Sequence, residues 1–131
     1  MKITDLVPML SVTDLSRTIA FYRDLLGFQV VSTYEHQGRT TWAALDRDGV
    51  EIMFNQAPGA WVESRDRAAR DYQVFYFRVD DVRALHAVIA ARAVACSPLR
   101  VTDYGMVEFE LRDPDHYWLW FGEPAPDADV S

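Results

Sequence analysis

Two glutamates alternate with apolar residues in a segment that has the pattern of a strand. They are Glu108 and Glu110, in residues 106–112. Because side chains alternate across a strand, both carboxylates are expected on one face. There they either hold a cationic ligand or act as a base with a raised pKa, or they lie solvated near a sheet edge. Glu51, in another predicted strand, is a third candidate base.

Other residue types that carry chemistry give weaker signals. The histidines His36, His86 and His116 lack the spacing of metal ligands, and we interpret His86 as a packing residue. The sequence shows no recognisable Ser-His-Asp or Cys-His pattern of a nucleophilic catalytic site and no glycine-rich phosphate loop. Cys96 follows a run of alanines and valines and is interpreted as buried and inert.

The elements that must position the glutamates occur twice in the chain. Shifting the chain by 67 positions aligns its halves without a gap and pairs, for example, Asp14 with Asp81 and Asp46 with Asp113. A fixed offset indicates one supersecondary unit used twice. Two copies of one unit usually enclose a shared pocket, into which each copy directs the same strand positions.

Each half is predicted to form a strand, a helix and three further strands. Asp14 and Asp81 are expected to cap the helices, and Gly27 to end the first one. The strands are predicted at residues 6–12, 28–34, 40–45, 50–55, 74–79, 94–97, 106–112 and 117–121.

Length and composition predict one globular domain without a membrane span. No apolar run approaches the ~20 residues that a span needs. The net charge of -7 argues against nucleic acid and permits a cationic ligand, although it also serves solubility. A single cysteine suits a reducing cytoplasm. Within the single domain 1–131, we expect a first module at 1–56, a linker at 57–73 with a short helix in 63–70, a second module at 74–124 and a frayed tail at 125–131.

The helix motif and the last turn resemble a known superfamily. Residues 14–28 resemble the first helix of the vicinal oxygen chelate superfamily, which includes glyoxalase I, fosfomycin-resistance proteins, extradiol dioxygenases and bleomycin-resistance proteins. Residues 112–115, Arg-Asp-Pro-Asp, resemble its turn before the last strand, where His116 replaces the usual glycine and must tolerate positive φ. The resemblance implies an α+β fold, in which two tandem βαβββ modules form a cupped, mostly antiparallel sheet with the helices outside.

The same resemblance makes a test for a metal site possible. Metal-dependent members take four His, Glu or Gln ligands from the first and last strands of the modules. By position these fall here on Val7, Met53, Val74 and Trp120. Because none offers an oxygen or an imidazole nitrogen, we predict no metal and no cofactor. Metal-assisted glyoxalase, dioxygenase and fosfomycin-transferase chemistry is then excluded as well.

Residues that share strand parity with these four positions are expected to line the cup. Aromatic and methionine side chains with a few polar groups suit a flat organic ligand. Trp61, in the linker, either covers the pocket as a lid or packs as a hydrophobic side chain that fixes the linker to the protein. The candidate ligand-binding residues are Met9, Glu51, Met53, Asn55, Trp61, Tyr76, Arg78, Glu108, Glu110, Trp118 and Trp120.

The opening segment resembles the bleomycin-resistance branch, whose members are homodimers without a metal of their own. Pro8 fits an edge strand or a strand that crosses between protomers. The resemblance implies a homodimer that sequesters an aromatic or cationic, bleomycin-like ligand in a cleft at its interface, and the single cysteine favours the cytoplasm as its compartment. The alternative is a metal-free isomerase or lyase that uses Glu108, Glu110 or Glu51 as base, with Tyr76 or Arg78 stabilising an enolate. A metal enzyme with a relocated site is a third hypothesis.

Overall fold

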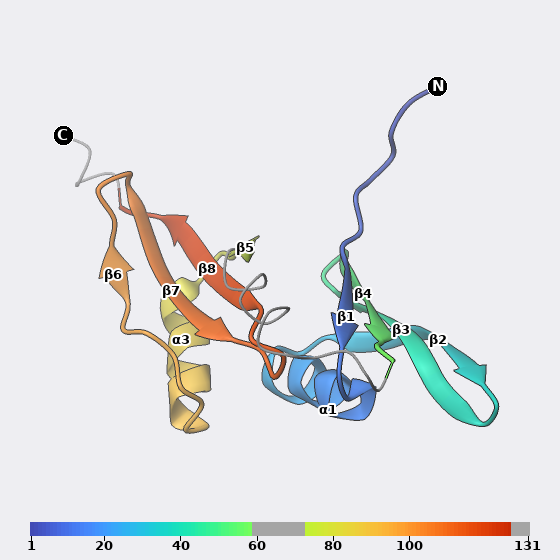
Figure 1. The fold of residues 1–131 in the computed structure, drawn as a ribbon. Coiled ribbons are helices and arrows are strands. Elements are labelled where there is room, and N and C mark those ends of the chain that lie inside the picture. Colours follow the sequence, from blue (N-terminus) through green and yellow to red (C-terminus); the bar gives the residue numbers. More distant parts are fainter. Residues whose placement is uncertain (59–72, 127–131) are drawn as a thin grey trace. The chain divides into compact units, whose positions relative to one another are not determined.

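The computed structural model describes residues 1–58 and 73–126, and the chain divides into two compact units, Met1–Glu63 and Ser64–Ser131. Each unit contains one strand–helix–three-strand module (Figure 1). The predicted α+β fold with two βαβββ modules is therefore confirmed. Among the described helices, none is long and apolar enough to cross a membrane.

The first module forms a four-stranded sheet in the order β1-β4-β3-β2. In this sheet β1 runs parallel to β4, and the other neighbours are antiparallel. Its elements are β1 (Met9–Val12), α1 (Leu15–Ala20), the π-helical turn η1 (Phe21–Leu25), β2 (Gln29–His36), β3 (Arg39–Arg47) and β4 (Val50–Gln56).

The second module repeats this order as β5-β8-β7-β6, with β5 parallel to β8. The prediction of a strand at residues 94–97 is wrong in position, because the strand that pairs with β7 is β6 at Arg100–Val101. Cys96 forms only an isolated bridge to Leu111, and Pro98, which has no N–H to donate, separates it from β6. The elements are β5 (Val74–Arg78), α3 (Val82–Ala91), β6 (Arg100–Val101), β7 (Met106–Arg112) and β8 (Trp118–Pro124).

The 67-residue repeat is visible in the strand register. Met9 pairs with Met53 in the first module, and Tyr76 pairs with Trp120 in the second, which is the same shift in both strands. The gap-free alignment is wrong in the third strand of each module. Ala43 pairs with Phe54, whereas Phe109 rather than Glu110 pairs with Phe121. The turn between β7 and β8 spans residues 113–117, whereas the turn between β3 and β4 spans only residues 48–49. The pairing of β7 with β8 is therefore displaced by one residue from the pairing that the gap-free alignment predicts.

Both helices begin at the predicted aspartates. The Asp14 carboxylate accepts from Arg17 N at 3.2 Å, and the Asp81 carboxylate accepts from Ala84 N at 3.0 Å. A second cap comes from the last strand of each module, at positions also related by the repeat. Leu15 N donates to Gln56 Oε1, and Val82 N donates to Glu123 Oε1, both at 2.9 Å. These bonds satisfy helix N–H groups that have no intrahelical partner and tie each helix to its sheet.

Stacked aromatic rings form part of the core under α3. The Phe109 and Phe77 rings lie on either side of Phe121, at centroid distances of 5.2 and 5.1 Å. His86 contacts the Phe109 ring edge-on at 4.9 Å, and its Nε2 lies 3.0 Å from Ser97 O, in line with a packing role. His116 has φ 71°, so it adopts the left-handed conformation expected where the family has glycine.

Candidate ligand-binding site

The sheet of the second module has an apolar face and a mixed face. Leu119 and Phe121 on the apolar face are at most 4% exposed, and α3 covers this side (Figure 1). The alternate positions of β5, β7 and β8 point to the other face, because opposed residues of paired strands share a side. The predicted residues that it brings together are Tyr76, Arg78, Glu108, Glu110, Trp118 and Trp120.

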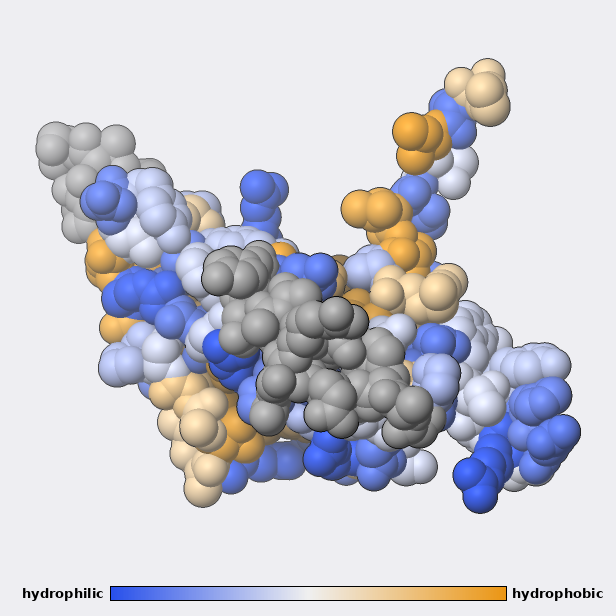
Figure 2. All heavy atoms as spheres, in the orientation of Figure 1, coloured by the Kyte–Doolittle hydropathy of each residue, from blue (hydrophilic) through white to orange (hydrophobic). Residues whose placement is uncertain are grey.

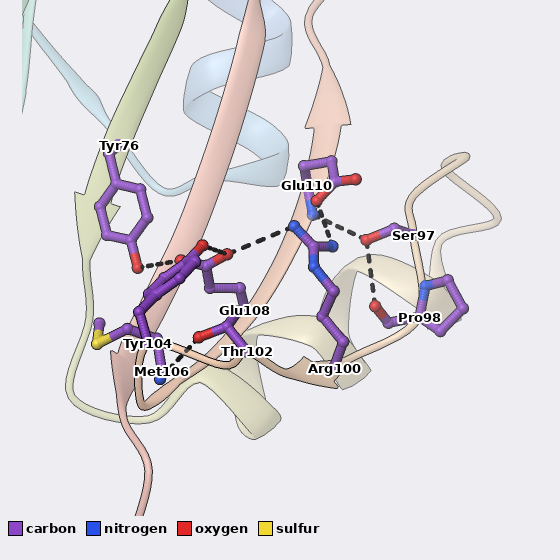
Figure 3. A network of polar contacts seen from close by, with 9 residues as sticks. All are labelled: Tyr76, Ser97, Pro98, Arg100, Thr102, Tyr104, Met106, Glu108 and Glu110. Carbon is purple, nitrogen blue, oxygen red and sulfur yellow. Dashed lines mark hydrogen bonds and ion pairs between the residues drawn. The ribbon is translucent and has the colours of Figure 1, made fainter.

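Glu108 is a fully buried carboxylate held by three donors. The Tyr76 hydroxyl donates to Glu108 Oε2 at 2.8 Å, and the Tyr104 hydroxyl donates to Oε1 at 2.7 Å (Figure 3). Arg100 Nη2 adds a longer contact to Oε1 at 3.4 Å. Because β7 lies inside the sheet rather than at its edge, the solvated alternative is wrong for Glu108. Both of its oxygens are engaged within the protein.

Gly122 makes the contact between Tyr76 and Glu108 possible. Tyr76 lies on β5 and Glu108 on β7, with β8 between them, and Gly122 is the β8 residue directly opposite Glu108. A Cβ at Gly122 would overlap the Tyr76 hydroxyl and approach the Glu108 side chain to 3.1 Å. The missing side chain therefore opens the passage through which the phenol crosses β8.

The two phenols remain protonated donors at neutral pH. Burial, followed by the hydrogen bond to Glu108, raises the pKa of Tyr76 to about 12. The hydrogen bond to Glu108 is also the main reason why the pKa of Tyr104 is raised. In both cases a phenolate beside the carboxylate is disfavoured by like charge.

Arg100 links both glutamates to the aromatic part of the face. Its Nη1 lies 2.5 Å from Glu110 Oε2, and its Cζ lies 5.6 Å from the centroid of the Trp120 ring. Arg112 stacks in the same manner on Trp118, with its Cζ 3.8 Å from the ring centroid. Arginine over an indole is a favourable cation–π arrangement. Among the described residues, the cation that pairs with both glutamates is thus Arg100.

Within the described part of the chain, one donor and one acceptor on this face have no hydrogen bond. Trp120 Nε1 is buried and has no acceptor among these residues. Glu110 Oε2 is also buried, and its ion pair with Arg100 meets the distance but not the geometry of a hydrogen bond. Buried polar groups are nearly always hydrogen-bonded in folded proteins, so these two atoms mark a place where a further group can bind.

In the first module, four predicted residues share the corresponding face of the sheet. Met9 is 61% exposed, and Met53, Asn55 and Glu51 are half-buried. They are joined by Trp42, which pairs with Asn55 in register. Trp61 lies outside the described residues, so its predicted role stays a prediction.

The residues at the family's metal positions do not fit an ion. Val7 precedes β1, and Met53, Val74 and Trp120 lie in strands, but none supplies an oxygen or imidazole ligand. Within residues 1–58 and 73–126, no group of three or more His, Cys, Asp or Glu side chains could hold a metal ion.

Sequence reasoning missed Arg100, Tyr104, Gly122 and Trp42. Arg100 and Tyr104 belong to β6 and the loop after it, which the misplaced strand at 94–97 hid. A glycine two residues after Trp120 could have signalled a close approach across β8. Cys96 is half-buried rather than buried, and burial raises the pKa of its thiol, which is therefore protonated at neutral pH.

The fold, with two strand–helix–three-strand modules, defines a class of proteins. Comparison with known families identifies this class. The chain belongs to the Glyoxalase/Bleomycin resistance protein/Dioxygenase superfamily, whose model matches residues 6–121. A relative in Escherichia coli (strain K12), the uncharacterized protein YaeR, is 32% identical over 107 residues, which are 79% of this chain and 82% of YaeR.

Solved structures with the same fold include an antibiotic binding protein and a bleomycin resistance determinant. The antibiotic binding protein TnmS3 from Streptomyces sp. CB03234 has a TM-score of 0.74 at 19% identity, covering 95% of this chain and 99% of its own. A bleomycin resistance determinant encoded on the transposon Tn5 has a TM-score of 0.73 at 21% identity, covering 93% and 98%. At these identities the likeness shows the fold.

Proposed function

We propose that this protein binds an aromatic small molecule on the mixed face of the second module, without a metal or cofactor. The observation that carries the proposal is an aromatic surface over a built polar network, in which Trp118 and Trp120 are half-buried and Tyr76 is 40% exposed. Stacking on aromatic rings, with a few placed polar groups, is how proteins bind flat organic ligands. The antibiotic binding function of the structural relative TnmS3 is consistent with such a role.

The described contacts favour the aromatic part of the predicted ligand over the cationic part. Glu108 is saturated by Tyr76, Tyr104 and Arg100, and Glu110 is paired with Arg100. Glu108 is therefore not left to hold a cationic group, and the charge of Glu110 is already balanced by Arg100. The same engagement argues against Glu108 as the base of the enzyme alternative, because a general base needs a free lone pair directed at its substrate.

Tryptophan-fluorescence titration tests this function. Purified protein is titrated with bleomycin and with a panel of flat aromatic compounds, and Trp118→Ala serves as the site variant. We expect saturable quenching by members of the panel that is weakened in Trp118→Ala. Absence of saturable binding across the panel would refute the binding function, whereas failure of bleomycin alone would remove only drug resistance. Elemental analysis of the same preparation tests the metal-free proposal.

We also propose a cytoplasmic homodimer. The segment before β1 exposes Ile3 (93%) and Leu6 (91%), and Figure 2 shows hydrophobic residues interspersed with hydrophilic ones along it. Exposed apolar side chains on one segment are typical of a protein–protein contact. Light scattering coupled to size exclusion tests the dimer, and a Leu6→Asp variant should shift it toward monomer. Localisation of a tagged chain by fractionation tests the compartment.

A further inference from the structure

Trp120 and Glu110 face each other across β8 and β7 and leave a donor and an acceptor unused. They are direct cross-strand partners, yet among residues 1–58 and 73–126 the buried Trp120 N–H finds no acceptor and the buried Glu110 Oε2 accepts no hydrogen bond. A buried donor without an acceptor is unfavourable, because it has lost its hydrogen bond to water without replacing it. The cost is recovered when a group from outside accepts from the indole.

The two glutamates of this face are held very differently. Glu108 is 0% exposed and receives hydrogen bonds from two phenols and a contact from Arg100. Glu110 keeps 22% of its side chain exposed, and among the described contacts its carboxylate is held by Arg100 alone. Glu110 is therefore the carboxylate that an incoming group can displace, while Glu108 keeps Arg100 in place.

The donors around Glu110 suit a planar, anionic group. The Arg100 side chain is 39% exposed, and its guanidinium lies 5.6 Å from the centroid of the Trp120 ring. A guanidinium and an indole N–H both donate, and arginine matches the geometry of a carboxylate. The arginines of this face, Arg78, Arg100 and Arg112, outnumber its two glutamates.

Resting on the proposed function, we propose that the ligand carries an anionic oxygen, such as a carboxylate, on its aromatic ring system. This oxygen replaces Glu110 at Arg100 and accepts a hydrogen bond from the Trp120 N–H. Glu110 then turns toward solvent. In the free protein, the Glu110 carboxylate occupies the position beside Arg100 that the ligand's anionic group takes on binding.

Calorimetric titration with three probes of equal ring size tests the charge preference. The probes are naphthoate, naphthylmethanol and naphthylmethylammonium. We expect naphthoate to bind at least about tenfold more tightly than the ammonium probe, as for a hydrogen bond to a charged group. Trp120→Phe and Arg100→Gln should each remove most of this preference. Trp118→Phe, in the same strand, should weaken all three probes alike and keep the preference.

Glu110→Gln makes a prediction of the opposite sign. The variant removes the internal competitor for Arg100, so naphthoate should bind several-fold more tightly than to the wild type. A loss of naphthoate affinity in Glu110→Gln, or an equal or tighter binding of the ammonium probe to the wild type, would overturn the inference.

The indole N–H resonance of Trp120 reports contact independently of affinity. It is identified as the cross-peak missing from Trp120→Phe. Naphthoate should move it downfield, as expected for a new charged acceptor, and binding without such a shift contradicts the inference. If other aromatic compounds bind and naphthoate does not, the charge inference fails and the binding function stands. If no aromatic compound binds, both fail.

Discussion

The Tyr76 phenol on β5 reaches across β8 to donate a hydrogen bond of 2.8 Å to Glu108 on β7. The contact joins strands that are not neighbours in the sheet and passes over Gly122, where a side chain would collide with the phenol. It places one aromatic ring, one buried carboxylate and the tip of the β6–β7 loop, through Tyr104, in a single network.

Gly122→Ala should destabilise the second module by forcing the Tyr76 ring from its place. Overpacking of this kind costs about 1–3 kcal/mol, which urea denaturation would measure. The double variant Tyr76→Ala with Gly122→Ala should show a smaller additional loss from the alanine at 122, because the colliding hydroxyl is gone. Equal losses from Gly122→Ala in both backgrounds would contradict the steric explanation.

Glu108→Gln should be far more costly than Glu110→Gln. The amide loses the charge that three donors share, and its NH₂ group opposes one of them, so we expect a loss of about 1.5–3 kcal/mol. Glu110 is partly exposed in a single ion pair, and its change to glutamine should cost less than about 1 kcal/mol. Chemical denaturation of both variants under identical conditions checks the order.

Stability should fall at alkaline pH through Tyr76. Burial and the hydrogen bond to Glu108 raise its pKa to about 12 in the folded protein, from an ordinary value of 10.0. The protonated phenol is thus favoured by folding, and its contribution is fully present below pH 10 and is lost as the pH rises toward about 12. Urea midpoints of the wild type and of Tyr76→Phe, compared from neutral pH upward, should converge in this window. A constant difference would contradict the assignment.

Glu123→Ala should weaken the start of α3. Its carboxylate accepts from Val82 N at 2.9 Å, and loss of a helix cap costs about 1 kcal/mol. Glu123→Gln keeps an acceptor and should be nearly neutral, as the natural Gln56 at the equivalent place in the first module indicates. Thermal unfolding of the two variants provides the measurement.

Much of the fold and part of the site follow from local patterns in the sequence. The alternation in residues 106–112 placed Glu108 and Glu110 on one face, and the 67-residue offset predicted that Met9 and Tyr76 take equivalent places. Both patterns depend only on the two-residue period of a strand and on the repetition of one unit. The family resemblance, combined with residue type, led to the prediction that the family's metal positions carry no suitable ligand.

The tertiary structure alone decided which groups meet these residues. Arg100 and Tyr104 reach Glu108 because β6 pairs with β7 so that Arg100 stands opposite Glu108. The one-residue displacement of β7 and the passage over Gly122 likewise depend on strand register. Alternation is a local property of the backbone, whereas register is decided by which distant segments bury their apolar faces together.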